Sequence, residues 1–365
     1  MIHNINMIMI KNRRKFLIFI PILIIMIISL LTMYNSKYIS HIYYNHFYKQ
    51  LIWYILFFLI VIFFPKLKNI YKYSFIIYIF NITLLILVLF IGKEINGAKA
   101  WFSFKGLSIQ PSELMKISYS LYLVNIINKY KRKNILKELL FLFKVLIIFL
   151  IPSILIFLEP DTGAIIFLLI ITISMLILSD IRKLWFILIF LIISLSLGVF
   201  FYLFYFKQDL LIDLIGTSFF YRMDRIINIK NNMQLENALI AIGNGNIKGL
   251  GLNNAAIYIP EAATDFAFAV CVSSFGFIGA LILLINYFII DCFFLYIIYK
   301  SINKTTRLIT SSFISVFIFS QIYNICMNIG LLPIMGIPLP LLSYGGSSLI
   351  VNGIYIGIIL KSNNI

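Results

Sequence analysis

Long apolar stretches separated by short polar segments extend through the whole chain. A helix that crosses a bilayer needs about 20 largely apolar residues. Candidate spans are 16–34, 51–65, 71–92, 113–128, 140–158, 163–179, 184–206, 266–299, 308–330 and 345–360. The fourth is the least apolar, because it contains Glu113 and Lys116. The pattern predicts an all-α polytopic membrane protein with about ten transmembrane helices, organised as one integral membrane domain over residues 1–365.

Lys and Arg residues are distributed unevenly between the polar segments. Eighteen of the thirty lie in segments on the same side as the N-terminus, and ten lie on the opposite side. Because cytoplasmic segments carry an excess of Lys and Arg, both termini are predicted to be cytoplasmic. The outer side then contains the large loop 207–265 and two shorter loops, 93–112 and 331–344. Residues 219–242 of the large loop have helical spacing, so we expect ordered structure there.

Composition narrows the class of protein further. Hydrophobic residues make up 62% of the chain and charged residues 12%, with a mean hydropathy of +1.02. These values exclude a soluble globular enzyme, a disordered tail and a disulfide scaffold. A formal net charge of +17 is also found in nucleic-acid-binding proteins, but most of these cations follow the membrane orientation, so no nucleic-acid partner is expected. Chemistry is expected on the outer side, where the long loops lie.

A short motif precedes the fourth span on the outer side. Pro111 and Ser112 suit the start of a helix, and Glu113 lies in the first turn, where the helix dipole favours an anion. Glu113 and Lys116 are three residues apart, so they can neutralise each other inside the bilayer. Two interpretations remain for Gln110 to Lys116: a capped helix with a structural ion pair, or a charged lining for a polar substrate headgroup.

Several outer residues have the chemistry to bind anions or cations. Arg222 and Arg225 are three apart on one helical face, and guanidinium groups bind phosphates such as a lipid-linked pyrophosphate. The alternative is a helix face that touches lipid headgroups. The glycine-rich stretch 240–251 either cradles an anion with its amides or forms a tight turn. Glu159 and Asp161 fit a turn, with a divalent cation site as the alternative.

Asp265 directly precedes the eighth span. A carboxylate there commonly stabilises the start of a helix, and the helix dipole is expected to keep its pKa low. The alternative is a general base within reach of a sugar hydroxyl. Residues 330–348 contain three prolines and four glycines, which predicts irregular backbone at the outer start of the last span. Such backbone is tolerated at membrane depth only where it is buried or lines a cavity.

The segments 110–116, 260–268 and 330–348, in this order on ten spans, resemble the SEDS family of RodA, FtsW and SpoVE proteins, which act in bacterial shape, elongation, division and sporulation. The resemblance extends from about Gly97 to the C-terminus, and the first three spans match only in hydropathy. Residues 159–163 make the chain most similar to RodA.

This resemblance implies a peptidoglycan glycosyltransferase that polymerises lipid II on the outer face of the bacterial cytoplasmic membrane. It implies that Asp265 is the catalytic base, that a divalent cation (Mg or Mn, with unassigned ligands) supports activity, and that the partners are a class B penicillin-binding protein and other elongation or division proteins. The substrate-binding residues that it implies are Gln110, Ser112, Glu113, Lys116, Lys99, Arg222, Arg225, Ser343, Tyr344 and Gly345.

The chain departs from the family pattern at three places. Ala100 stands where the family usually has Arg, Ser273 and Ser274 stand where it often has an acidic pair, and residues 243–246 differ from its usual glycine loop. These departures leave open a weakly active scaffold of a cell-wall synthase. A lipid II flippase is the second alternative, and it predicts ionisable residues spread through a midplane cavity.

Overall fold

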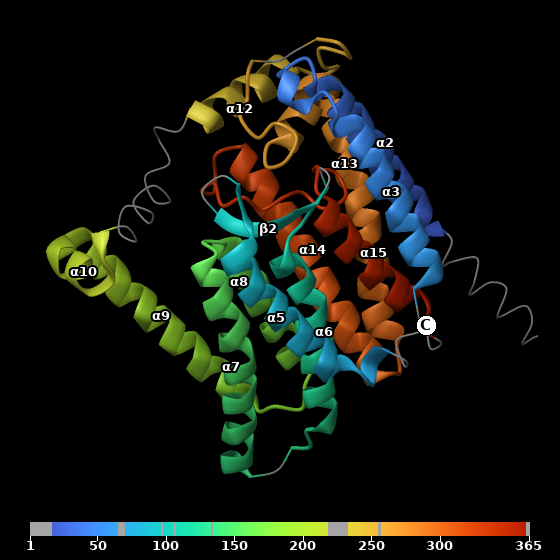
Figure 1. Ribbon diagram of the computed structural model, residues 1–365. Coiled ribbons are helices and arrows are strands. Elements are labelled where there is room, and N and C mark those ends of the chain that lie inside the picture. The colour runs from blue at the N-terminus through green and yellow to red at the C-terminus, as the bar shows by residue number, and fades with distance from the viewer. Residues whose placement is uncertain are drawn as a thin grey trace, which may run out of the picture.

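The computed structural model describes residues 17–64, 70–95, 98–104, 107–132, 134–217, 233–254 and 257–362. Most of them lie in helices that pack side by side in a bundle (Figure 1). The first half contains α2 (Phe19–Ser36), the 3-10 helix η1 (His41–Tyr43), α3 (His46–Phe63), α5 (Ser74–Ile91), α6 (Pro111–Lys129), α7 (Ile135–Leu158) and α8 (Thr162–Ile177). The second half contains α9 (Lys183–Phe206), α10 (Gln208–Ile215), α12 (Met233–Asn244), α13 (Ala267–Lys300), α14 (Lys304–Asn328) and α15 (Gly346–Leu360).

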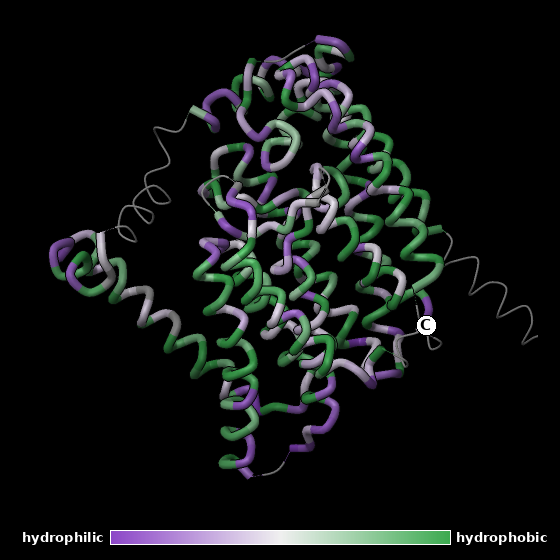
Figure 2. The backbone as a smooth tube through the Cα atoms, viewed as in Figure 1, coloured by the Kyte–Doolittle hydropathy of each residue, from purple (hydrophilic) through white to green (hydrophobic). Residues whose placement is uncertain are grey.

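Each predicted span coincides with one of these helices. Within the described residues, seven helices are long and apolar enough to cross a membrane, namely α3 with the turn before it, α2, α5, α7, α9, α13 and α14. The helices α8 and α15 are apolar but shorter. Figure 2 shows hydrophobic residues along the helices and hydrophilic residues at the two ends of the bundle, which is the pattern expected of a protein embedded in a bilayer.

The outer segment 93–112, expected as a loop of an all-α protein, contains a small antiparallel sheet. Strands β1 (Lys93–Ile95), β2 (Ala98–Phe104) and β3 (Leu107–Ile109) pair in that order. Lys93 lies opposite Trp101 in the register. Hydropathy windows detect long apolar runs, so strands of three to seven residues escape them. The sheet ends beside Gln110, the N-cap of α6.

The polar helix α6 is buried at the centre of the bundle, against α5, α8, α14 and α15. Its hydroxyl groups are paired across the helix contacts: Asn81 of α5 donates to Ser118 at 3.0 Å, and the Ser120 hydroxyl lies 2.6 Å from that of Tyr355 on α15. Polar groups inside a membrane protein are costly unless another helix satisfies them. The low apolarity of this span therefore follows from its central position.

Helix α13 is interrupted at Gly276, whose backbone has φ of 65°. At the interruption, the carbonyl groups of Ser273 and Ser274 accept hydrogen bonds from the backbone N–H groups of Leu250 (2.9 Å) and Gly251 (3.0 Å). The glycine-rich loop therefore replaces the helical hydrogen bonds that α13 loses. We call residues 245–251 the clasp.

The clasp corrects the interpretation of the glycine-rich stretch as an anion cradle. On the far side of the interruption, the N–H of Phe277 donates to the carbonyl of Asn246 at 2.9 Å. The glycines are required because the two backbones touch: a Cβ at Gly249 would lie 2.2 Å from the Ser274 carbonyl oxygen. The amides of Gly249, Leu250 and Gly251 already donate to backbone carbonyls and are not free to bind an anion.

The large loop 207–265 contains helices, and the prediction of helical structure in residues 219–242 is confirmed for residues 233–242. Helix α12 covers residues 233–242 of the predicted stretch, and α10 lies earlier in the loop at the end of α9 (Figure 1). Residues 218–232 are outside the described part of the chain, and Arg222 and Arg225 lie among them. The predicted role of this arginine pair in binding phosphate thus stays a prediction.

Candidate active site

A half-open cavity of about 600 Å³ lies where the sheet, the starts of α3, α6 and α8, and the segments before α13 and α15 come together. It is at the end of the bundle that the charge distribution predicts to be outside. Its charged residues are Lys49, Lys93, Glu113, Asp161, Glu261 and Asp265. The fold thus brings the three motifs of the sequence, 110–116, 260–268 and 330–348, to one cavity.

Asp265 belongs to a turn that precedes α13. The N–H groups of Thr264 and Phe266 both donate to the carbonyl of Glu261 at 3.1 Å, and the Glu261 backbone has a positive φ of 54°. The N-cap of α13 is Phe266, and no side chain of the cap residue bonds the helix. The carboxylate of Asp265 lies on the cavity, close to Gly336: a Cβ at that glycine would be 3.8 Å from Oδ2. The interpretation of Asp265 as a helix-capping carboxylate is therefore wrong.

The electrostatic environment of Asp265 also differs from the prediction. Burial, and then the negative charge of Glu261, raise the pKa of Asp265 to about 7. The prediction of a low pKa assumed that the helix start would bind the carboxylate, and it does not. Among the described residues no hydrogen-bond donor contacts this carboxylate. A carboxylate without donors in a poorly solvated site is a stronger base than one in water.

Asp161 organises the motif that precedes α6. Its Oδ1 accepts a hydrogen bond from the N–H of Ala164 at 3.1 Å and so caps α8. Its Oδ2 accepts from the side chains of Gln110 (2.7 Å) and Ser112 (3.0 Å). Burial raises the pKa of Asp161, and the hydrogen bonds from Ala164 and Ser112 oppose the shift. Gln110 lines the cavity, whereas Ser112 is buried behind it.

The pair Glu159 and Asp161 does not fit a divalent cation. Both oxygens of Asp161 already accept hydrogen bonds. Burial, and then the charge of Asp161, raise the pKa of Glu159 to about 8. Across the described ranges there is no group of three or more His, Cys, Asp or Glu side chains able to hold a metal ion. The turn interpretation of this segment therefore agrees with the geometry.

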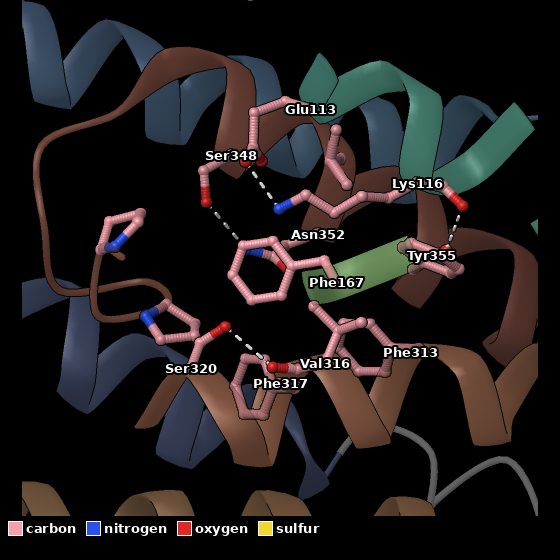
Figure 3. Close-up of a pocket in the computed structure, with 13 residues that line it drawn as sticks. Glu113, Lys116, Phe167, Phe313, Val316, Phe317, Ser320, Ser348, Asn352 and Tyr355 are labelled. Atoms are coloured by element: carbon pink, nitrogen blue, oxygen red, sulfur yellow. Dashed lines mark hydrogen bonds and ion pairs between the residues drawn. The ribbon is translucent and has the colours of Figure 1, made fainter. Parts of the chain in front are cut away.

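Glu113 and Lys116 form the ion pair that their spacing predicts, with 2.6 Å between Nζ and Oε1. Both residues are buried, and the ammonium group of Lys116 lies 4.1 Å from the ring centre of Phe167. Glu113 lines both the main cavity and a small chamber of about 20 Å³, whereas Lys116 lines only the small chamber (Figure 3). That chamber has room for one water molecule.

The loop between α14 and α15 forms another part of the cavity wall. The hydroxyl of Ser343 donates to the Thr264 carbonyl at 2.6 Å, and the N–H of Tyr344 donates to the Ala263 carbonyl at 2.8 Å. The ring of Tyr344 packs against His46, with 4.3 Å between ring centres, and Gly345 also lines the cavity. Irregular backbone that lines a cavity was predicted here and is confirmed. Ser343 instead fixes the turn that carries Asp265.

Within the described residues, the lysines that line the cavity differ from Lys99 and Lys116, which the sequence singled out. Lys99 donates to the carbonyl of Phe90 at 2.8 Å and does not line the cavity. Lys49 and Lys93 do line it, and sequence reasoning missed them. A signal was present, because both are lysines at the outer ends of spans, where the orientation rule disfavours them.

Comparisons with known proteins identify the family. The family of cell cycle proteins FtsW, RodA and SpoVE matches residues 13–364. The chain belongs to this family. With its apolar helices, this makes it a multi-pass protein of the bacterial cytoplasmic membrane.

Two relatives and two solved structures illustrate the similarity. The probable peptidoglycan glycosyltransferase FtsW of Buchnera aphidicola subsp. Schizaphis graminum is 34% identical over 307 residues, covering 80% of this chain and 82% of the relative. The FtsW of Haemophilus influenzae is 33% identical over 306 residues, covering 78% and 72%. The rod shape determining protein RodA of Thermus thermophilus has the same fold, with a TM-score of 0.66, 23% identity and coverage of 93% and 94%. A chain of a peptidoglycan synthase complex, solved in work on the coordination of polymerization and crosslinking, has a TM-score of 0.78, 22% identity and coverage of 94% and 96%.

Proposed function

We propose that this chain is a peptidoglycan glycosyltransferase that polymerises lipid II on the outer face of the cytoplasmic membrane. The observation that carries the proposal is the placement of Asp265. Its carboxylate faces a cavity of about 600 Å³, caps no helix, and has a pKa raised to about 7. The relatives named as probable peptidoglycan glycosyltransferases support the same activity.

In the proposed reaction, the carboxylate of Asp265 takes the proton of the 4-hydroxyl of the acceptor sugar. The hydroxyl oxygen then attacks the anomeric carbon of the donor sugar with inversion, and the bond to the pyrophosphate breaks. Undecaprenyl pyrophosphate leaves with the bonding electrons. An ordinary aspartate with a pKa of about 3.9 is a weak base for a hydroxyl. The raised pKa of Asp265 brings it closer to the value that favours general base catalysis at neutral pH.

Lys49 and Lys93 are the lysines that line the cavity within the described residues, and we assign them to the pyrophosphate of the substrate. Replacing either with Ala is expected to raise KM for lipid II about tenfold with little change in kcat, because a cation–phosphate contact is present before and during the reaction. Steady-state kinetics of purified variants check this. Lys99→Ala is the matched control, since Lys99 points to the Phe90 carbonyl. An equal rise in KM for Lys99→Ala would contradict the assignment.

A divalent cation, Mg or Mn, belongs to the proposal as a counter-ion of the substrate pyrophosphate. The described residues contain no cluster of metal ligands, so we assign no protein ligand and no step of the reaction to it. A class B penicillin-binding protein is the proposed partner, together with other elongation or division proteins. The similar chain from a complex that coordinates polymerization and crosslinking supports a transpeptidase partner of this kind.

The flippase alternative requires a polar route across the bilayer. Glu113 and Lys116, inside the bundle, neutralise each other at 2.6 Å, and the small chamber that both residues line has only about 20 Å³. The scaffold alternative rests on Ala100, Ser273 and Ser274. The backbone carbonyls of both serines bind the clasp, and the Ser274 hydroxyl accepts a hydrogen bond from Asn35 at 2.6 Å. These serines have structural partners, so they carry no argument against activity.

The experiment that tests the function supplies purified protein with lipid II and a divalent cation, with and without a transpeptidase partner. Glycan products are resolved by length on a gel. The proposal predicts long glycan strands. Translocation of labelled lipid II across vesicle membranes without any polymer would favour the flippase, and neither activity would favour the scaffold.

A further inference from the structure

We propose that Asn324 and Asn328 of α14 are positioning residues that hold Asp265 in its catalytic orientation and keep its carboxylate free. The proposal rests on the proposed function, since it concerns the base of that reaction. Both asparagines are fully buried. They are four residues apart and therefore lie on one face of α14, which packs beside α13.

The two side chains bind the same main-chain atom. The Nδ2 groups of Asn324 and Asn328 donate to the carbonyl oxygen of Asp265 at 2.9 and 3.0 Å. In a buried site, hydrogen bonds of this kind are costly to break, because the released carbonyl loses its partners. The peptide group of Asp265 is therefore fixed from a neighbouring helix while its side chain remains unrestrained by hydrogen bonds.

Asn328 also performs the capping function that the sequence assigned to Asp265. Its Oδ1 accepts a hydrogen bond from the N–H of Ala269 at 3.2 Å. That N–H belongs to the first turn of α13, where helix donors lack partners within the helix. A side chain near the helix start normally accepts such a bond. Because Asn328 supplies the acceptor, the carboxylate of Asp265 is not drawn onto the helix.

Asn324 connects Asp265 to the neighbouring loop between α14 and α15, which also lines the cavity. Besides the carbonyl of Asp265, its amide donates to the carbonyl of Ile337 at 2.8 Å. Ile337 follows Gly336, the residue whose backbone approaches Oδ2 of Asp265. The buried amide of Asn324 thus fixes the position of Asp265 relative to residues 336 and 337, which also line the cavity.

Neutral substitutions such as Asn→Leu at these positions leave the charges of the cavity in place. The titratable groups that line the cavity with Asp265 are His46 and Lys49 from α3, Lys93 from β1, Glu113 from α6, Asp161 before α8, Glu261, and Tyr344 before α15. None comes from α14, whose described charged residues, Lys304 and Arg307, lie at its opposite end. A change in the pH profile of an Asn→Leu variant therefore reports on the geometry around Asp265.

The test is Asn328→Leu, assayed by polymerisation of lipid II across pH. Without Asn328 the N–H of Ala269 has no acceptor, and the carboxylate of Asp265 is the nearest replacement in sequence. We expect kcat to fall by about tenfold or more, because misplaced catalytic groups cost this much, with KM within about threefold. The acidic limb of kcat/KM is expected to move to lower pH by about one unit, since a carboxylate that accepts N–H bonds has a lower pKa.

Two further variants keep the proposal testable if this one folds poorly. Asn328→Asp retains an acceptor for Ala269, so its acidic limb is expected not to move to lower pH. Asn324→Leu is expected to lower kcat while Asn328 still caps α13. The matched control is Asn286→Leu, which removes a buried asparagine whose amide donates only within its own helix, to Ile282 at 2.7 Å.

Asn328→Leu with the kcat and pH profile of the Asn286→Leu control would overturn the positioning role. So would an acidic limb of Asn328→Asp that moves down as far as that of Asn328→Leu. In contrast, a wild-type protein that makes no polymer under any condition would overturn the proposed function itself. The two failures are thus distinguishable in one set of reactions.

Discussion

Replacing Asp265 with Asn is expected to lower kcat for lipid II polymerisation by about a thousandfold, the size of effect that loss of a general base produces. The amide is nearly isosteric with the carboxylate but cannot take the proton of the acceptor hydroxyl. KM is expected to change by less than about threefold, because the residue acts on the reacting proton and not on the pyrophosphate. The fold should persist, since the carboxylate caps no helix.

Glu261→Gln is the matched control for this variant. Glu261 lines the same cavity and raises the pKa of Asp265 through its charge, as the lesser cause after burial. Its loss is expected to reduce kcat by less than about tenfold and to move the acidic limb of activity to lower pH. An Asp265→Asn protein that keeps more than a tenth of wild-type activity would contradict the role of Asp265 as base. A loss of activity in Glu261→Gln that exceeds the loss in Asp265→Asn would contradict it as well.

The second large effect concerns stability. Gly249→Ala is expected to lower the free energy of unfolding by about 2–4 kcal/mol, the range for a strained backbone combined with a steric clash. Gly249 has a positive φ of 81°, and the new Cβ would lie 2.2 Å from the backbone oxygen of Ser274. The clasp and α13 can move apart to admit the new Cβ only if the hydrogen bonds that bridge the interruption of α13 are broken. Thermal unfolding in detergent measures the loss.

Gly243→Ala provides the comparison within the same glycine-rich stretch. Gly243 lies in α12, and no atom lies within 4 Å of the Cβ that it would acquire. Ala is the better helix former, so a gain of about 0.5–1 kcal/mol is expected. If Gly249→Ala and Gly243→Ala have equal stability, the clasp tolerates a Cβ at residue 249 and does not require glycine there.

Much of the fold could be predicted because the bilayer imposes simple rules on the chain. Apolar length located each span, and the Pro111 helix start with an acidic first turn identified α6 despite its polar residues. The sheet of residues 93–109 escaped the same reasoning, since short strands on a membrane surface have no long apolar signature. The interruption of α13 at Gly276 also escaped it, because the partner of that segment is the clasp, which the sequence suggested only as a turn or an anion site.

The candidate site was likewise predicted only in part. Asp265 was found because its position at the start of a span and the surrounding motif are local in sequence. The direction of its pKa was predicted wrongly, because the acceptor that caps α13 belongs to Asn328, 59 residues beyond the N–H that it binds. Lys49 and Lys93 face the cavity only because α3 and the sheet meet there. Contacts between residues far apart in sequence determine the pKa of Asp265 and the charge of the cavity, and local sequence patterns do not predict such contacts.

The pH dependence of kcat/KM of the wild-type enzyme with lipid II tests the central claim most directly, since this quantity reports the ionisation of the free protein. With a pKa of about 7, Asp265 is protonated below neutral pH and cannot accept a proton. The rate is therefore expected to fall about tenfold for each pH unit below about 7 and to level off above it. A rate that stays constant between about pH 5 and about pH 8 would contradict the role of the half-buried carboxylate of Asp265 as the base.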